Sequence, residues 1–158
     1  METAVKNKVK EIAWPGKTFI TIRGTLPFDK LTTFFSKNYG AIYGAINKIG
    51  LQANEPPCAI YYSVDEAKKV TDLAAAVPVS AVVPEIQGFT KVGIPAAKAL
   101  TITHYGSYDS MASSYALLEK YMAEHGLKRK WMIEEYLSDP VAEKDPSTFK
   151  TNIYFLLE

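Results

Sequence analysis

Two adjacent glutamates, Glu134 and Glu135, lie in the segment WMIEEYLSDP, whose other residues are typical of a buried strand. Neighbouring strand residues face opposite sides of a sheet, so Glu134 shares its face with Tyr136 and Glu135 takes the other face. A carboxylate among aromatic rings is costly unless a cation or a hydrogen-bond donor satisfies it. A lipophilic cation offers both charge and a surface for stacking. One of the two acids therefore indicates a site for such a ligand.

The elements that position these acids occur twice along the chain. ITIRGTLPFDKL begins at Ile20 and TITHYGSYDSM begins at Thr101, and both run from an alternating strand through a glycine to an aromatic-aspartate pair. A helical pattern, a strand, an acid-rich turn and a second strand follow in each half. The unit strand-helix-strand-strand is therefore repeated, over about residues 8–80 and about residues 88–158.

Two long helices are predicted, over about residues 28–49 and 108–125. Their apolar residues recur at spacings of three and four, which places them on one face. Each pattern ends in Gly followed by Leu, which predicts a left-handed C-terminal cap. The small residues of segment 40–45 are interpreted as a close-packed surface. The two apolar stripes consist of Leu31, Phe35, Ile42, Ile46 and Ile49, and of Tyr108, Met111, Tyr115, Leu118 and Met122.

The predicted fold class is α+β. Consecutive strands joined by short turns pair antiparallel, and one helix in each copy covers one face of the sheet. We expect one domain over residues 1–158, with tandem repeats related by pseudo-twofold symmetry, an antiparallel sheet with two long helices, and a central ligand cleft between the copies. The strands are expected at 56–63, 71–80, 131–138 and 151–158, with 9–13 and 89–95 adding one strand to each copy.

Comparison of the two copies separates the two acids. Pairing Tyr61 with Tyr136 sets Ala59 against Glu134, so the repeated fold does not itself require a charge at that position. We therefore predict that Glu134 lies in the cleft and that Glu135 is a solvent-facing or rim residue. The alternative is that both glutamates are solvated on an exposed face, because Glu is almost never fully buried unless it is paired.

Composition excludes several other kinds of site. The formal net charge of +1 argues against a nucleic-acid surface. Cys58 is the single cysteine and the chain has two histidines, so neither a disulfide nor a zinc site is expected, and no cofactor is predicted. No segment has the apolar length of a signal peptide or a membrane span, so a cytoplasmic protein without membrane contact is expected. The oligomeric state is left open.

The segments HYGSYDSM, EEYLSDP and TNIYFLLE resemble the GyrI-like small-molecule-binding family, which includes effector-binding domains of AraC-type and MerR-type regulators. The resemblance runs from about Lys8 to the end of the chain. It implies a duplicated fold with a ligand cleft between the copies, where Glu134 faces aromatic rings and Tyr136 matches the strand tyrosine. Regulatory members carry a helix-turn-helix domain before this unit. The chain shows none, so we expect a standalone member without direct DNA binding.

The first hypothesis is a binding protein for an aromatic, cationic or amphipathic small molecule, of the kind found in multidrug-binding and transcription-regulating members. Glu134 supplies the charge in this hypothesis. Ring surface is expected from Tyr61, Tyr105, Trp131 and Tyr136.

Two alternatives stay open. Some standalone members resemble hydrolases of cyclopropane-containing natural products, with Glu134 as general acid or base assisted by Tyr136 or Tyr105, since an apolar pocket raises the pKa of a carboxylate. The other alternative is a protein inhibitor of a nucleic-acid enzyme, which would use the acidic turn with Asp139, Glu143 and Asp145.

Two weaker signals are interpreted as structural. The Gly-Lys-Thr of PGKT lacks the upstream glycine of a phosphate loop, so nucleotide binding is not expected. His104 precedes Tyr105 at a strand end and is interpreted as a hydrogen-bonded rim histidine rather than a catalytic one.

Overall fold

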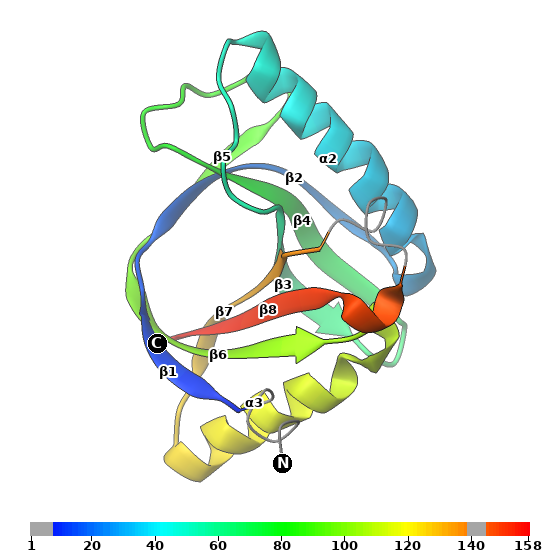
Figure 1. The fold of residues 1–158 in the computed structure, drawn as a ribbon, viewed down its shortest axis with the longest axis vertical. Coiled ribbons are helices and arrows are strands. Elements are labelled where there is room, and N and C mark those ends of the chain that lie inside the picture. Colours follow the sequence, from blue (N-terminus) through cyan, green and yellow to red (C-terminus); the bar gives the residue numbers. More distant parts are fainter. Residues whose placement is uncertain (1–7, 139–144) are drawn as a thin grey trace. The chain divides into compact units, whose positions relative to one another are not determined.

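The computed structural model describes residues 8–138 and 145–158, apart from the side chain of Asp109. Its contacts form two compact units. Among the described residues, the C-terminal unit combines 8–14 with 97–138 and 145–158, and the N-terminal unit is Pro15–Ala96. Each unit contains an antiparallel sheet and one long helix (Figure 1). The predicted α+β class is confirmed.

The N-terminal unit follows the predicted order of strand, helix, strand and strand. Its strands lie in the order β3-β4-β2-β5, and every neighbouring pair is antiparallel. A short 3-10 turn, η1, leads into helix α2. The bounds are β2 Lys17–Pro27, η1 Phe28–Lys30, α2 Leu31–Lys48, β3 Cys58–Asp65, β4 Val70–Val79 and β5 Thr90–Ile94.

Helix α2 packs on β2 and β4 through the predicted stripe. Ile42 and Ile46 are buried against Ile20 of β2 and against neighbouring β4 residues. Full burial of each isoleucine contributes about 1.5–3 kcal/mol. Ile49, the last stripe position, is 42% exposed because the helix ends at Lys48. The prediction of close packing is wrong at Gly40 and Gly44, since a Cβ at either position would meet nothing within 4 Å among the described residues.

The C-terminal unit repeats the same order. Its strands lie in the order β1-β6-β8-β7, again antiparallel throughout. Strand β1 lies within the predicted first repeat in sequence but pairs with β6 of the second, while β5 pairs with β2, so each unit gains one strand. The bounds are β1 Lys10–Trp14, β6 Ala97–Tyr105, η2 Tyr108–Ser110, α3 Ala112–His125, β7 Arg129–Tyr136, η3 Pro146–Thr148 and β8 Lys150–Leu157.

Helix α3 covers one face of the sheet of the C-terminal unit. Leu118 is fully buried in a cluster to which β6 contributes Ile102 and β8 contributes Ile153 and Phe155. Strand residues alternate between faces, so the even-numbered positions of β7, including Glu134, share the face of α3. Odd-numbered positions of β7 take the opposite face.

Both long helices end as predicted. Gly50 and Gly126 have φ values of +79° and +64°, a conformation that is open to glycine at little cost. The amide of Leu51 donates to the carbonyl of Ile46 at 3.2 Å, and the amide of Leu127 donates to that of Met122 at 2.9 Å. These bonds satisfy carbonyls at the ends of the two helices and turn the chain toward the next strand.

Candidate functional site

Glu134 of β7 is a buried carboxylate with two phenolic partners. The Tyr136 hydroxyl donates to Glu134 Oε1 at 2.6 Å, and the Tyr115 hydroxyl of α3 donates to Oε2. Glu134 is 6% exposed. Both phenols act as donors, which suits an ionised carboxylate because that group only accepts hydrogen bonds. The fold therefore keeps a satisfied acid under helix α3.

Local structure explains why these three side chains meet. Glu134 and Tyr136 are two residues apart on one strand, so they project from the same face of the sheet. Tyr115 lies one turn before Leu118 on the buried face of α3, and its ring packs against Phe155 with centroids 5.9 Å apart. A hydroxyl within an apolar helical stripe needs a buried partner, and Glu134 provides it. From the sequence, Tyr115 was predicted only as part of the apolar stripe, and its hydrogen bond to Glu134 was not predicted.

Further rings extend the site toward solvent. Tyr108 meets Tyr136 edge-on with centroids 5.7 Å apart, and it packs against Phe149 at 5.3 Å. Tyr108 is 41% exposed, whereas Phe149 is buried. The aromatic surface thus runs from an exposed ring inward to the carboxylate. Tyr108 was predicted only as part of the helical stripe, and Phe149 was not predicted at all.

One buried polar atom beside this cluster has no hydrogen-bond partner within the described residues. It is Oγ1 of Thr151, which is fully buried and lies opposite Tyr136 in the ladder between β7 and β8. An unsatisfied buried hydroxyl costs about 1–3 kcal/mol. The polar groups at this end of β7 and β8 are therefore not all satisfied by the described residues.

Glu135 is buried as well, and the prediction that it is a solvent-facing or rim residue is wrong. It is 8% exposed. Asn152 Nδ2 donates to Glu135 Oε1 at 2.9 Å, and the Tyr154 hydroxyl donates to the same oxygen at 3.1 Å. Both partners come from β8, whose Asn152 lies directly opposite Glu135. The fold thus satisfies one carboxylate on each face of β7.

The remaining predicted ligand-binding residues do not gather around Glu134 within the C-terminal unit. Trp131 and Tyr105 lie on the sheet face opposite α3, where Trp131 is half-buried and Tyr105 is 40% exposed. Tyr61 lies on β3 of the N-terminal unit and is half-buried. A role of these three residues in ligand binding stays a prediction. Glu134 and Tyr136, in contrast, contact each other directly.

His104 is hydrogen-bonded as expected, although it is buried rather than at a rim. Its Nδ1 lies 2.8 Å from Ser114 Oγ, and its Nε2 lies 3.0 Å from both the Ser107 carbonyl and Ser110 Oγ. Because a carbonyl only accepts, Nε2 carries the proton in this arrangement and Nδ1 accepts from Ser114. His104 therefore ties the end of β6 to η2 and α3 and does not activate Ser110 as a nucleophile.

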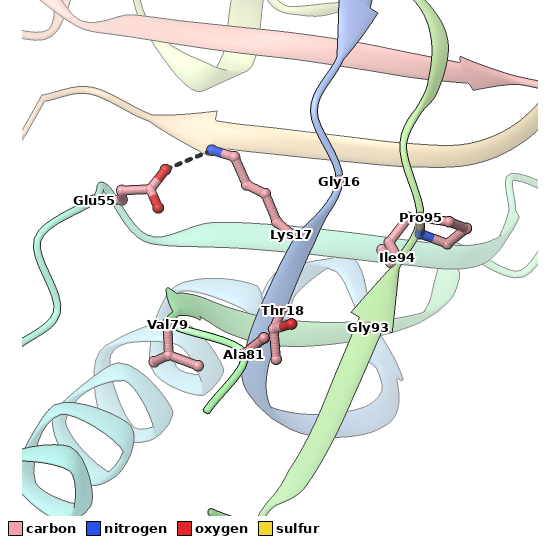
Figure 2. Close-up of a pocket in the computed structure, with 9 residues that line it drawn as sticks. All are labelled: Gly16, Lys17, Thr18, Glu55, Val79, Ala81, Gly93, Ile94 and Pro95. Atoms are coloured by element: carbon pink, nitrogen blue, oxygen red, sulfur yellow. Dashed lines mark hydrogen bonds and ion pairs between the residues drawn. The ribbon is translucent and has the colours of Figure 1, made fainter. Parts of the chain in front are cut away.

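A cavity of about 550 Å³ in the N-terminal unit contains none of the predicted site residues (Figure 2). Lys17 extends along its wall to Glu55, with Nζ and Oε1 2.7 Å apart. Gly16 has a φ of +80°, and a Cβ there would lie 2.8 Å from the amide nitrogen of Ala96. The Gly-Lys-Thr of PGKT therefore makes a tight turn into β2, whereas a phosphate loop leads into a helix.

The acidic turn proposed as a protein-binding surface is described only at one end. Asp139 and Glu143 lie outside the described residues. Asp145 accepts from the amide and the hydroxyl of Ser147, at 3.0 and 2.7 Å, and thereby caps η3. These bonds hold the pKa of the Asp145 carboxyl below its usual value.

Within residues 8–138 and 145–158, no group of three or more His, Cys, Asp or Glu side chains is placed to hold a metal ion. No helix in the described part of the chain is long and apolar enough to cross a membrane.

Comparison with known proteins gives a family match over almost the whole chain. The sequence model of the GyrI-like small molecule binding domain matches residues 7–158. No curated protein matches the chain.

Several solved structures share this fold. The C-terminal domain of EcmrR superposes with a TM-score of 0.82 at 20% identity, covering 96% of this chain and 97% of that one. In a complex of EcmrR with DNA, the match covers 57% of the EcmrR chain. A Listeria innocua hydrolase encoded by lin2189 superposes with a TM-score of 0.69 at 16% identity, covering 97% of this chain and 93% of that one. SAV2435, solved with tetraphenylphosphonium, superposes with a TM-score of 0.67 at 12% identity, covering 96% of this chain and 94% of that one.

Proposed function

This chain belongs to the GyrI-like family of small-molecule-binding domains, and we propose that it binds an aromatic cation or a cationic amphipathic molecule at Glu134. The observation that carries the proposal is the buried Glu134 carboxylate, which two phenols hold beneath a path of aromatic rings. An acid in this position supplies charge where water does not screen it. Ring faces beside it suit a flat, delocalised cation.

The ligand approaches from the side of Tyr108. This ring is 41% exposed and packs on Tyr136, whereas Tyr115 packs on the buried Phe155. Because Glu134 is covered, the ligand reaches it by moving the Tyr136 ring, and its positive charge replaces the Tyr136 hydroxyl at the carboxylate. Tyr115 keeps its bond and holds Glu134 in place.

The charge of Glu134 is expected to dominate affinity. Two unit charges 4 Å apart attract by about 4 kcal/mol at an effective dielectric constant of about 20. Desolvation of the ligand and displacement of the Tyr136 ring offset part of this attraction. An isosteric Glu134→Gln substitution is therefore expected to weaken binding by about tenfold or more, since about 1.4 kcal/mol corresponds to a factor of ten.

Calorimetric titration with tetraphenylphosphonium tests the proposal, because SAV2435, a protein of the same fold, was solved with that cation. Glu134→Gln should weaken binding, and Glu119→Gln should not, since Glu119 lies exposed on the same helix α3 that covers the site. A neutral probe, triphenylphosphine oxide, should bind wild type and Glu134→Gln alike. Equal tetraphenylphosphonium affinity of wild type and Glu134→Gln would remove the central role of the carboxylate.

A hydrolase is the second candidate, and the 2.6 Å contact between the Tyr136 hydroxyl and Glu134 favours it. A carboxylate and a phenol at this distance can pass a proton between them, as a general acid-base pair must. The match to the Listeria innocua hydrolase is a likeness of fold at 16% identity.

Tyr136→Phe separates the two candidates. In a binding protein this variant keeps the ring and removes the hydroxyl that competes with the ligand, so cation affinity should not fall. In a hydrolase, Tyr136→Phe should abolish turnover of an electrophilic cyclopropane compound. Mass spectrometry of the reaction products measures this turnover. Wild-type turnover no faster than that of Glu134→Gln would count against catalysis.

A further inference from the structure

We propose that the C-terminal unit carries a second ligand site on the sheet face opposite Glu134, and that this site takes a small planar organic anion such as an aromatic carboxylate. The site shares no residue with the Glu134 cluster. Binding at this second site can therefore be tested independently of cation binding at Glu134.

The site is a cavity of about 410 Å³, within the usual range for a small-molecule pocket. It lies over β1, β6 and β8, whose registers bring its residues together. Lys10 lies opposite Thr101, and Thr103 lies opposite Asn152. All four side chains project from the face that α3 does not cover.

A chain of hydrogen bonds holds the floor of the cavity in place. Thr103 Oγ1 donates to Asn152 Oδ1 at 2.6 Å, and Asn152 Nδ2 donates to the buried Glu135 at 2.9 Å. The Tyr154 hydroxyl donates to the same Glu135 oxygen at 3.1 Å. The polar groups beneath a ligand are therefore already oriented, and binding need not pay the full entropy of ordering them.

The charges that line the cavity select an anion. Lys8 and Lys10 line it, and no acidic side chain does so among the described residues. A third lysine, Lys150, lies close by, with its Nζ 5.7 Å from the centre of the Tyr105 ring. Glu135 projects from the same sheet face beside Asn152, but it does not line the cavity, and its Oε1 accepts from two donors. The charged side chains that line the cavity are therefore lysines.

The remaining lining residues select a flat and partly apolar body. Tyr105 and Tyr154 contribute ring surface and phenolic hydroxyls, and Ile12 contributes an apolar side chain. A benzene ring fits between such side chains while its carboxylate meets the lysines, which are point-charge donors to an anionic oxygen. This chemistry differs from that of the Glu134 site, where the fixed charge is negative.

NMR titration of ¹⁵N-labelled full-length protein tests the inference with 4-hydroxybenzoate, and 4-hydroxybenzamide serves as the uncharged analogue of the same shape. The acid should shift the backbone amides of Thr101 and Thr103 and the side-chain amide of Asn152. The benzamide should bind about tenfold more weakly, because it lacks the charge that the lysines attract.

Charge reversal supplies the matched control. Lys10→Glu should weaken 4-hydroxybenzoate binding by about tenfold or more. Lys98→Glu should not, because Lys98 is exposed on β6 of the same sheet but faces the opposite side. Both are exposed surface substitutions, so the fold should tolerate them.

Three outcomes would overturn the inference: equal affinity for the benzamide, equal effects of Lys10→Glu and Lys98→Glu, or shifts confined to residues outside this cavity. Glu134→Gln should leave 4-hydroxybenzoate binding unchanged. A failure at either site is therefore recognisable without reference to the other.

Discussion

Removal of the two phenolic hydroxyls from Glu134 should destabilise the protein strongly and more than additively. The substitutions are Tyr136→Phe and Tyr115→Phe, alone and together. Each keeps the aromatic ring and removes one donor from a carboxylate that is 6% exposed. The buried Glu134 carboxylate then has fewer hydrogen-bond donors. Leaving a buried acceptor without its donor costs more free energy than replacing both groups by apolar ones.

The expected magnitude follows from the burial of the acceptor. A hydrogen bond to a charged group contributes about 1.5–3 kcal/mol, so each single variant should lose about that much free energy of unfolding. The two donors share one acceptor, so their effects are coupled. In the double variant no second phenol remains to satisfy the carboxylate, and the loss should exceed the sum of the single losses by about 0.5 kcal/mol or more.

Urea unfolding measures these differences. With a slope of about 2 kcal/mol per molar urea, a loss of about 2 kcal/mol lowers the midpoint by about 1 M. Tyr121→Phe is the matched control, because the half-buried Tyr121 ring also packs on the core while its hydroxyl donates to Glu11 Oε2 at 2.6 Å in an exposed position. There water replaces the lost bond, so the midpoint should scarcely move.

If Tyr136→Phe and Tyr115→Phe lower the midpoint no more than Tyr121→Phe does, the two phenols do not stabilise a buried charge at Glu134. Strict additivity in the double variant would show that the two phenols do not share a buried carboxylate. Either result would also weaken the case for Glu134 as the charge that a ligand meets, since an accessible carboxylate is screened by water.

Two further predictions concern the N-terminal unit. Gly16→Ala should cost clearly more stability than Gly88→Ala in thermal unfolding, because both residues have positive φ but only Gly16 would place its Cβ against a backbone atom, 2.8 Å from Ala96 N. Asp72→Asn should show a pH-dependent loss, because the Arg23 guanidinium lowers the pKa of Asp72 in the folded state. That contribution is present above the unfolded pKa of about 3.9 and disappears as the pH falls through the folded value, so the two proteins should converge in stability at low pH.

Much of the fold could be predicted because local signals and tertiary contacts agree. The stripe with Ile42 and Ile46 does bury against the sheet, and Gly50 and Gly126 do end the helices. The strands begin and end close to the predicted positions. Periodicity succeeds at these positions because each element needs only one buried face, whatever its partner is.

Local sequence patterns did not predict the features that depend on a neighbour distant in sequence. The close packing expected at Gly40 and Gly44 is absent within the described residues, because both glycines are exposed and a Cβ at either would meet nothing within 4 Å. Glu135 was expected near solvent because Glu is seldom buried without a partner. Its partners are Asn152 and Tyr154, and only the register of β7 with β8 brings them opposite.

The amino-acid sequence by itself determined the duplicated strand-helix-strand-strand order, the α+β class and the side of β7 from which each glutamate projects. Alternation of side chains along a strand and the apolar period of a helix are properties of the local chain. They set Glu134 on the face of Tyr136 without any knowledge of the fold.

Tertiary structure decided which hydroxyls reach which carboxylate. Tyr115 is 19 positions from Glu134, and nothing in the local pattern distinguishes it from an apolar stripe residue until α3 packs on the sheet. Strand pairing likewise gave Glu135 its partners and set Lys10 beside Thr101. Hydrogen bonds between buried polar groups depend on distances of a few tenths of an ångström, and only packing sets these.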